Sequence, residues 1–221
     1  MTGRFALYAP YAKIKAQFDV EEFAELTPRY NITPGQKILF LSQLNEDHSN
    51  HLLYLSWGLV PFWAKDKKIG NRLIIARAET VSDKPAFRQS FKSKRGVIIM
   101  SGFFEWKQEQ IKQPYYFKNK NDELLAVAAI WDRWQSEEGE VIESCCLITT
   151  NANKLMMPIH HRMPALLNKN DLPLWMDNTQ CNKPELLKLL NPYSNDGLEC
   201  YPVTTKMNNS RFNDHQAIEP L

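Results

Sequence analysis

The strongest candidate for chemistry in this sequence is Glu105, a carboxylate that follows an apolar run and lies among aromatic residues. Residues 98–100 are apolar and predict a buried strand, and Phe103, Phe104 and Trp106 surround the carboxylate. A carboxyl group buried beside aromatic rings is disfavoured in its charged form, which would suit Glu105 to donate or accept a proton near neutral pH. The alternative is a Glu105 that points to solvent from an edge strand, and these residues alone do not decide between the two.

His160 and His161 form a second candidate, because imidazoles exchange protons near neutral pH. Adjacent side chains of an extended segment point to opposite faces, so we expect these two not to share a metal ion. The five histidines show no HxxxH or HExxH spacing, and we expect no metal and no cofactor. A lone histidine is usually structural or merely exposed. However, Asn151 is typical of a helix cap, and such a helix start could bind an anion beside His160.

Three arginines from distant segments could hold phosphate groups. Arg77 ends a predicted strand, Arg4 lies near the start of the chain, and Arg162 follows the histidines. A guanidinium group matches two phosphate oxygens at once, so the three together would grip a phosphate backbone. Taken singly, each is an ordinary surface arginine.

Residues 65–95 form a basic segment that includes Lys67 and Lys68. This segment carries ten Lys and Arg residues and three Asp and Glu residues, whereas the rest of the chain carries 17 and 22. A basic segment on an otherwise acidic chain is expected of a surface that binds a polyanion. The alternative is a solvated lysine-rich loop, which is the commoner explanation of a charge cluster by itself.

Length and composition indicate an ordinary globular protein. Of the 221 residues, 43% are hydrophobic and 24% charged, and we expect one domain over residues 1–221. No apolar run is long enough to span a membrane and no signal peptide is evident, so we expect a cytoplasmic protein that does not bind membranes. The four cysteines form no CxxC pair, and we expect buried free thiols. For oligomeric state, a monomer is the default expectation.

Many short strands and few long helices are expected to position these groups. Strands are predicted at 1–9, 37–41, 52–57, 73–77, 96–101, 114–118, 124–131, 142–149, 200–205 and 217–221. Helices are predicted within 12–26, where Asp19 and Glu22 have the spacing of a capping box, and at 172–176 and 184–190. Residues 29–35 indicate a turn. The pattern favours an α+β domain built on a curled β-sheet or barrel-like core flanked by short helices.

Six short motifs occur in order along the chain. They are Arg4-Phe5, Arg29-Tyr30-Asn31, Trp57-Gly58 with Pro61 and Trp63, the run from Ala76 to Thr80, the run from Gly102 to Trp106, and Ile159-His160 with Arg162-Met163-Pro164. With Pro202-Val203 and the region around Asn208, they make essentially the whole chain resemble the SOS response-associated peptidase (SRAP) family of abasic-site-processing proteins.

The resemblance implies a compact β-rich domain that holds single-stranded DNA, or a single-to-double-strand junction, in a basic groove during the response to DNA damage. In the family, removal of the initiator Met exposes an N-terminal Cys. Its thiol attacks the aldehyde of an abasic site and closes a stable thiazolidine ring, which links protein and DNA covalently. The peptidase label comes from the N-terminal processing.

The resemblance also implies roles for individual residues. Glu105 matches the acid/base carboxylate of the family and His160 matches its histidine. The positions that match or are expected to join the DNA-binding surface are Arg4, Trp63, Lys67, Lys68, Ile75, Arg77, Thr149 and Arg162. Among these, Trp63 matches an aromatic residue near the strand junction and Thr149 a polar contact close to the lesion.

Two positions depart from the family pattern. Residue 2 is Thr where the family has its nucleophilic Cys, and residue 75 is Ile where the family has an asparagine. A Thr hydroxyl supplies essentially no anion near neutral pH, and an oxazolidine ring closed by Thr2 should reopen readily in water. Loss of a hydrogen-bonding partner at position 75 would cost roughly 1–3 kcal/mol. We therefore expect weak or absent covalent trapping.

Three functions are compatible with these departures. If Met1 is removed, the α-amine of Thr2 could form a Schiff base with the abasic aldehyde, and β-elimination could then cut the strand while Glu105 and His160 move protons. Alternatively, the protein is a non-catalytic module that binds single-stranded DNA. The third alternative is a peptidase or amidase that uses Thr2 as an N-terminal nucleophile.

Overall fold

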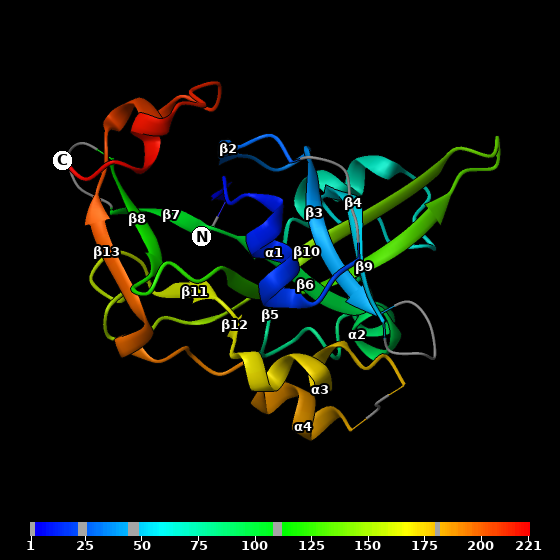
Figure 1. Cartoon of the computed structure of the whole chain (residues 1–221). Coiled ribbons are helices and arrows are strands. Elements are labelled where there is room, and N and C mark those ends of the chain that lie inside the picture. The colour runs from blue at the N-terminus through cyan, green and yellow to red at the C-terminus, as the bar shows by residue number, and fades with distance from the viewer. Residues whose placement is uncertain (1–2, 22–25, 44–48, 108–111, 180–181) are drawn as a thin grey trace.

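The core of the molecule is a closed barrel of five strands. The computed structural model describes residues 3–21, 26–43, 49–107, 112–179 and 182–221 (Figure 1). The barrel strands are β3 (Lys37–Gln43), β4 (Asn50–Trp57), β6 (Arg95–Met100), β9 (Leu125–Gln135) and β10 (Val141–Asn151). They pair in the order β10-β4-β3-β6-β9, and β9 also pairs with β10, which closes the ring.

Side chains on both faces of the central barrel strands are buried. All six residues of β6 are buried, as are six consecutive residues of β9 and seven of β10. Continuous apolar runs of this kind are expected where both faces of a strand are covered. Three short strands extend the barrel: β5 (Ile75–Arg77) and β11 (Arg162–Pro164) pair with β10, and β12 (Leu166–Leu167) pairs with β9.

A second sheet lies beside the barrel. It contains β13 (Leu198–Pro202), β8 (Gln113–Asn119), β7 (Gly102–Lys107), β1 (Arg4–Leu7) and β2 (Arg29–Ile32), in that order. Figure 1 shows this sheet on the side opposite the long β9–β10 hairpin, with the red C-terminal segment above it. The chain passes from the barrel into this sheet at Ser101, between β6 and β7.

Short helices cover the remaining surfaces. They are α1 (Tyr11–Phe18), α2 (Arg88–Ser93), α3 (Leu172–Met176) and α4 (Lys183–Lys188), with 3-10 turns at Lys67–Arg72, Lys169–Asp171, Asn195–Gly197, Thr205–Asn208 and His215–Ile218. The fully buried Arg95 donates to the backbone carbonyls of Phe91 and Trp175, so it ties the ends of α2 and α3 together. In the described part of the chain, each helix lacks the length or the apolar character needed to cross a membrane.

The expected α+β fold on a curled barrel is confirmed. Predicted strands overlap β1, β3, β4, β5, β6, β8, β9, β10 and β13, and the two predicted helices near residues 172 and 184 overlap α3 and α4. The predicted turn at 29–35 is partly wrong, because residues 29–32 form β2. Pairing with β1 provides one edge of this strand, and the Asn213 side chain accepts hydrogen bonds from the N–H groups of Tyr30 and Asn31 at its other edge.

Three further local predictions are wrong. Asn151 does not cap a helix but ends β10, where it pairs with Arg162 of β11. Residues 217–221 do not form a strand: His215–Ile218 is a 3-10 turn, and Pro220 makes an isolated bridge to Val203. Asp19 does not begin a helix but ends α1 in a left-handed conformation with φ 48°, while Glu22 and the rest of the second predicted piece up to residue 25 lie outside the described residues.

Candidate functional site

Glu105 lies in the middle of the second sheet. Arg4 of β1 pairs with Phe104, so the start of β1 runs beside Glu105, and Tyr115 of β8 pairs with Glu105 on the other side. The residue is 3% exposed, and its Oε1 accepts a 3.3 Å hydrogen bond from the N–H of Trp106. The side chain is therefore buried and does not point to solvent.

The sharp corner that leads into β7 depends on Gly102. A Cβ atom at this position would lie 2.4 Å from the ring of Tyr116 and 2.5 Å from the carbonyl oxygen of Phe117. The N–H of Ser101 also donates to the carbonyl of Ala6 at 2.8 Å. Close packing at this corner thus fixes the register of β7 and, with it, the position of Glu105.

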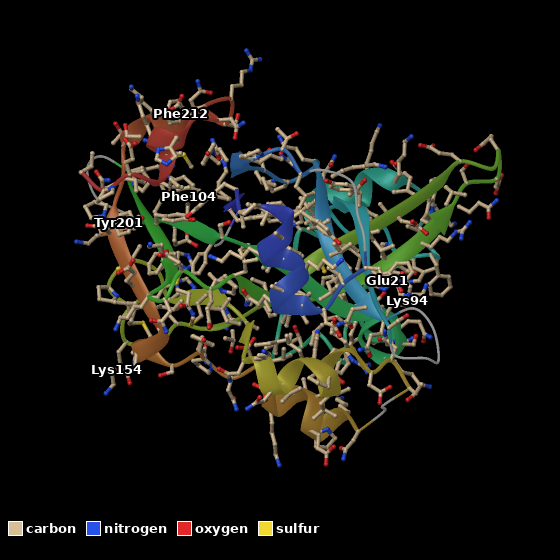
Figure 2. The ribbon with its side chains drawn as sticks, viewed as in Figure 1. Glu21, Lys94, Phe104, Lys154, Tyr201 and Phe212 are labelled. Carbon is tan, nitrogen blue, oxygen red and sulfur yellow. The ribbon has the colours of Figure 1, made fainter. Side chains whose placement is uncertain are left out.

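Aromatic side chains surround β7 on its outer face. The Phe104 ring lies 4.8 Å from the ring of Tyr116, and both belong to a small buried cluster that includes Met207. Figure 2 shows Phe104 between Phe212 of the C-terminal segment and Tyr201 of β13. The C-terminal segment therefore covers the sheet next to the residue that carries the carboxylate.

His160 ends the turn that joins β10 to β11. Its backbone N–H donates to the carbonyl of Met156 at 2.9 Å, and the N–H of Arg162 donates to its Nδ1 at 3.0 Å. The carbonyl oxygen of Arg162 also lies 3.2 Å from Nδ1, so both backbone polar groups of Arg162 are close to this ring nitrogen. The imidazole is thus held in one orientation by the backbone.

The rings of His160 and His161 stack with 4.4 Å between centroids and 23° between planes. We expected adjacent histidines of an extended segment to point in opposite directions, which is wrong because His160 directly follows a turn and the backbone bends at His161. Among the described residues, no three His, Cys, Asp or Glu side chains gather as metal ligands.

Glu105 and His160 come from segments 55 positions apart, yet they interact electrostatically. Burial lowers the pKa of His160 below its usual value, and the carboxylate of Glu105 acts in the opposite direction. At neutral pH the imidazole is therefore neutral. A buried carboxylate and a neutral imidazole can each accept a proton and later return it, as the members of a general acid/base pair do.

Arg162 is buried in a network that fixes the backbone beside His160. Its guanidinium forms a bidentate pair with Glu79, at 2.5 and 3.0 Å, and also donates to the Asn151 side chain at 2.9 Å and the Thr149 carbonyl at 2.7 Å. Its side chain is 8% exposed and that of Glu79 is 46% exposed. The hydrogen bonds from Arg162 lower the pKa of Glu79, which keeps the carboxylate charged.

Thr149, Ile75 and Arg77 lie next to this network. Strands β5 and β10 run parallel, with Thr149 beside Arg77 and Leu147 beside Ile75. Thr149 is fully buried, Ile75 is partly buried against the core, and Arg77 is exposed. Of these three, Arg77 is the one that presents a charge to solvent.

Arg4 is engaged with the C-terminal segment. Its Nη1 donates to the Asn31 side chain at 3.1 Å and to the Met207 carbonyl at 2.9 Å, and the guanidinium lies 5.5 Å from the centre of the Trp106 ring. Asn31 in turn donates to the carbonyls of residues 209 and 212. Arg4 therefore helps to fix the segment that covers β7.

Trp63, Lys67 and Lys68 lie at the other end of β10. Lys67 pairs with Glu140 at 2.8 Å, in the hairpin that joins β9 to β10, while Trp63 is 47% exposed on the segment between β4 and β5. Thr149 is eight residues from the start of β10, a separation of about 26 Å along an extended strand. Figure 1 shows the tip of the β9–β10 hairpin and β11 on opposite sides of the molecule.

The structure thus brings together Glu105 and His160, and separately Arg77, Thr149 and Arg162 on neighbouring strands. Thr2 lies outside the described residues, although Gly3, to which it is joined, precedes the residue that pairs with Phe104. Glu79 and Asn31 belong to sequence motifs, but no local pattern indicated that they bind Arg162 and Arg4. Those contacts span 83 and 27 positions, beyond the range of spacing rules.

Comparisons with known proteins find relatives that match nearly the whole chain. The sequence model described as "SOS response associated peptidase (SRAP)" matches residues 1–210. The chain is 39% identical to the abasic site processing protein YoqW of Bacillus subtilis over 99% of both chains, and 32% identical to the abasic site processing protein HMCES of Xenopus tropicalis, over 88% of this chain and 66% of that one. A crystal structure of a protein from Bacteroides thetaiotaomicron superposes with a TM-score of 0.86 at 26% identity, over 99% of both chains.

Proposed function

Because the chain belongs to the SOS response associated peptidase (SRAP) family, we propose that it binds DNA at abasic sites and processes them with Glu105 and His160. The observation that carries the proposal is the electrostatic pairing of these two residues beside the start of β1. Thr2 is covalently joined to Gly3 at that start. The amine of residue 2 would be the nucleophile once Met1 is removed.

The ring-opened form of an abasic site carries an aldehyde, with which an amine forms an imine. The nitrogen of Thr2 would attack the aldehyde carbon, and Glu105 would accept a proton from the attacking nitrogen and pass it to the carbonyl oxygen. The neutral imidazole of His160 would serve as the base in the elimination that follows. Loss of water gives the imine. Removal of a proton from the neighbouring sugar carbon, with departure of the 3′-phosphate oxygen, would then cut the strand.

Arg77 is our primary candidate for contact with a DNA phosphate, because its side chain is exposed on β5. Arg4 and Arg162 hold other protein groups, so their contribution would come from positive charge near the site and from shaping it. We assign Trp63, Lys67 and Lys68 to nucleic acid beyond the lesion, since an exposed aromatic ring and nearby cations suit an unpaired strand.

Borohydride trapping tests the proposal. Incubation with abasic single-stranded DNA should yield a reduced covalent adduct, whereas undamaged DNA of the same length should not. Mass spectrometry of the N-terminus should establish that Met1 is removed in the protein used. Glu105→Gln should slow adduct formation, because the amide cannot accept the proton. Absence of an adduct from protein that lacks Met1 would refute the imine mechanism.

The non-catalytic DNA-binding module is the second candidate, and the two sequence departures favour it. A partly buried Ile75 offers no hydrogen bond to an opened sugar, and Thr2 lacks the thiol that closes a stable ring. Under this alternative, single strands bind in a salt-sensitive manner but no adduct forms. The double variant Thr2→Cys with Ile75→Asn should then crosslink to abasic DNA, because Glu105 and His160 are retained.

A further inference from the structure

A row of four exposed cations begins at Arg77 and continues across α2. It consists of Arg77, Lys84, Arg88 and Lys92, and we call it the basic row. The N–H of Val81 donates to the carbonyl of Arg77 and the N–H of Arg88 to the carbonyl of Lys84, both at 2.9 Å, so the backbone coils helically along much of this stretch. Arg88 and Lys92 are four residues apart on α2 and thus share one face of it, and Lys84 lies one turn before the helix.

The charges that neighbour the basic row form ion pairs with other residues, although Arg77 also acts on the carboxylate of Glu79. Lys94 pairs with Asp132 at 2.5 Å, Lys183 with Asp83 at 2.7 Å, and Glu79 is bound by Arg162. Within the described residues, the four members of the row form no ion pair. Their exposed positive charge is therefore available to an external anion.

A hollow of about 220 Å³ lies between α2 and α4 at the end of the row. Its lining consists of Ser82, Arg88, Phe91, Lys92, Lys183 and Leu186. Arg88 and Lys92 are its exposed cations on α2, whereas Lys183 pairs with Asp83 and the Ser82 side chain hydrogen-bonds to the same carboxylate. The guanidinium of Arg88 and the ammonium of Lys92, beside this hollow, are two neighbouring donors that suit phosphate oxygens.

We propose that the basic row binds the phosphate backbone of the DNA strand that extends from the abasic site, with one phosphate held by Arg88 and Lys92 of α2. The inference rests on the proposed function and extends it, because it assigns a path to the strand outside the reaction site. The path is continuous with that site, since Arg77 lies beside Thr149 at the start of the row.

The test compares the double variant Arg88→Gln/Lys92→Gln with a charge-matched control, Lys15→Gln/Lys120→Gln, whose lysines are exposed on α1 and after β8. Binding is measured by fluorescence anisotropy as a function of salt. Three abasic oligonucleotides are used: a short one that fills only the reaction site, and two that extend it on the 5′ or the 3′ side.

We expect the double variant to bind the short oligonucleotide as the wild type does and to lose affinity for the strand extended on one side. Each lost phosphate contact should reduce the slope of log K against log salt by about 0.7, so two should reduce it by about 1.4. The control pair should keep the wild-type slope. All four residues are exposed, so thermal unfolding should be unchanged.

An unchanged salt slope on both extended strands would refute the proposal that the basic row binds DNA. An equal reduction of the slope in the Lys15→Gln/Lys120→Gln control would refute it as well. Borohydride trapping on the short oligonucleotide reports on the proposed chemistry independently. An adduct with an unchanged slope would refute only the basic row, and a reduced slope without an adduct would refute only the imine mechanism.

Discussion

Replacing Glu79 with Gln should destabilise the protein by removing the charge that faces Arg162. Breaking a fully buried ion pair costs about 3–5 kcal/mol, and breaking an exposed one about 0–1 kcal/mol. Here Arg162 is buried, but Glu79 is 46% exposed and solvent screens it. Arg162 also keeps Asn151 and the Thr149 carbonyl as acceptors. We therefore expect the free energy of unfolding to fall by about 1–2 kcal/mol at pH 7. Each kcal/mol should lower Tm by roughly 2–4 °C.

The effect of Glu79→Gln should depend on pH in a defined direction. The pKa of Glu79 is lowered in the folded protein, so its contribution is fully present above the unfolded pKa of about 4.3. That contribution is lost as the pH falls through the folded pKa. The difference in stability between the wild type and the variant should shrink steadily as the pH is lowered from 5.

Urea unfolding at pH 7 and at lower pH measures both effects. Asp83→Asn is the matched control, because it removes a neighbouring carboxylate whose pair with Lys183 is exposed on both sides, at 68% and 49%. We expect this control to change stability much less. If Glu79→Gln and Asp83→Asn proved equal, or if the effect of Glu79→Gln were the same at every pH, the pair with Arg162 would not be the source of stability.

The remaining predictions concern Gly102, His160 and Trp63. Gly102→Ala should cost about 1–3 kcal/mol in urea unfolding because its Cβ would overlap the Tyr116 ring, and a neutral result would contradict the close packing described there. In an NMR titration, His160 should show a pKa below 6.5. Glu105→Gln should lower that pKa further, because the carboxylate that favours the imidazolium is gone. A rise in the pKa would contradict the electrostatic interaction between Glu105 and His160. Trp63→Ala should weaken binding of DNA that reaches the β9–β10 hairpin by about 1–3 kcal/mol, while a short oligonucleotide at the lesion site should bind as before.

Periodicity was a good guide to the barrel because its strands are stabilised by burial, which the sequence records directly. Residues 98–100 and the apolar stretches of β9 and β10 could be identified without knowledge of their partners. In contrast, β2 depends on the side chain of Asn213, which lies 183 positions from Tyr30. A strand whose edge is satisfied by a distant side chain carries no periodic signal.

The residues of the site could be predicted from the sequence, but the contacts between them could not. Glu105 and His160 could be named from residue type and from resemblance, whereas the stacking of His160 on His161 depends on a turn whose geometry is not evident from adjacent histidines. Arg162 looked like a phosphate ligand, because nothing near it in sequence revealed that Glu79 already occupies its guanidinium. Local rules identify donors and acceptors, but only the fold decides which of them meet.

The change at position 75 can be separated from the scaffold that holds the acid/base pair. Glu105 is set by the register of β7 against β1, and His160 by the backbone of Met156 and Arg162. Ile75 contributes to neither set of contacts: it lies beside Leu147 and is partly buried against the core. Ile75→Asn should therefore lower stability modestly through lost apolar burial while leaving the pKa of His160 unchanged. An NMR titration of that variant that showed a shifted His160 would mean that position 75 acts on the acid/base pair directly.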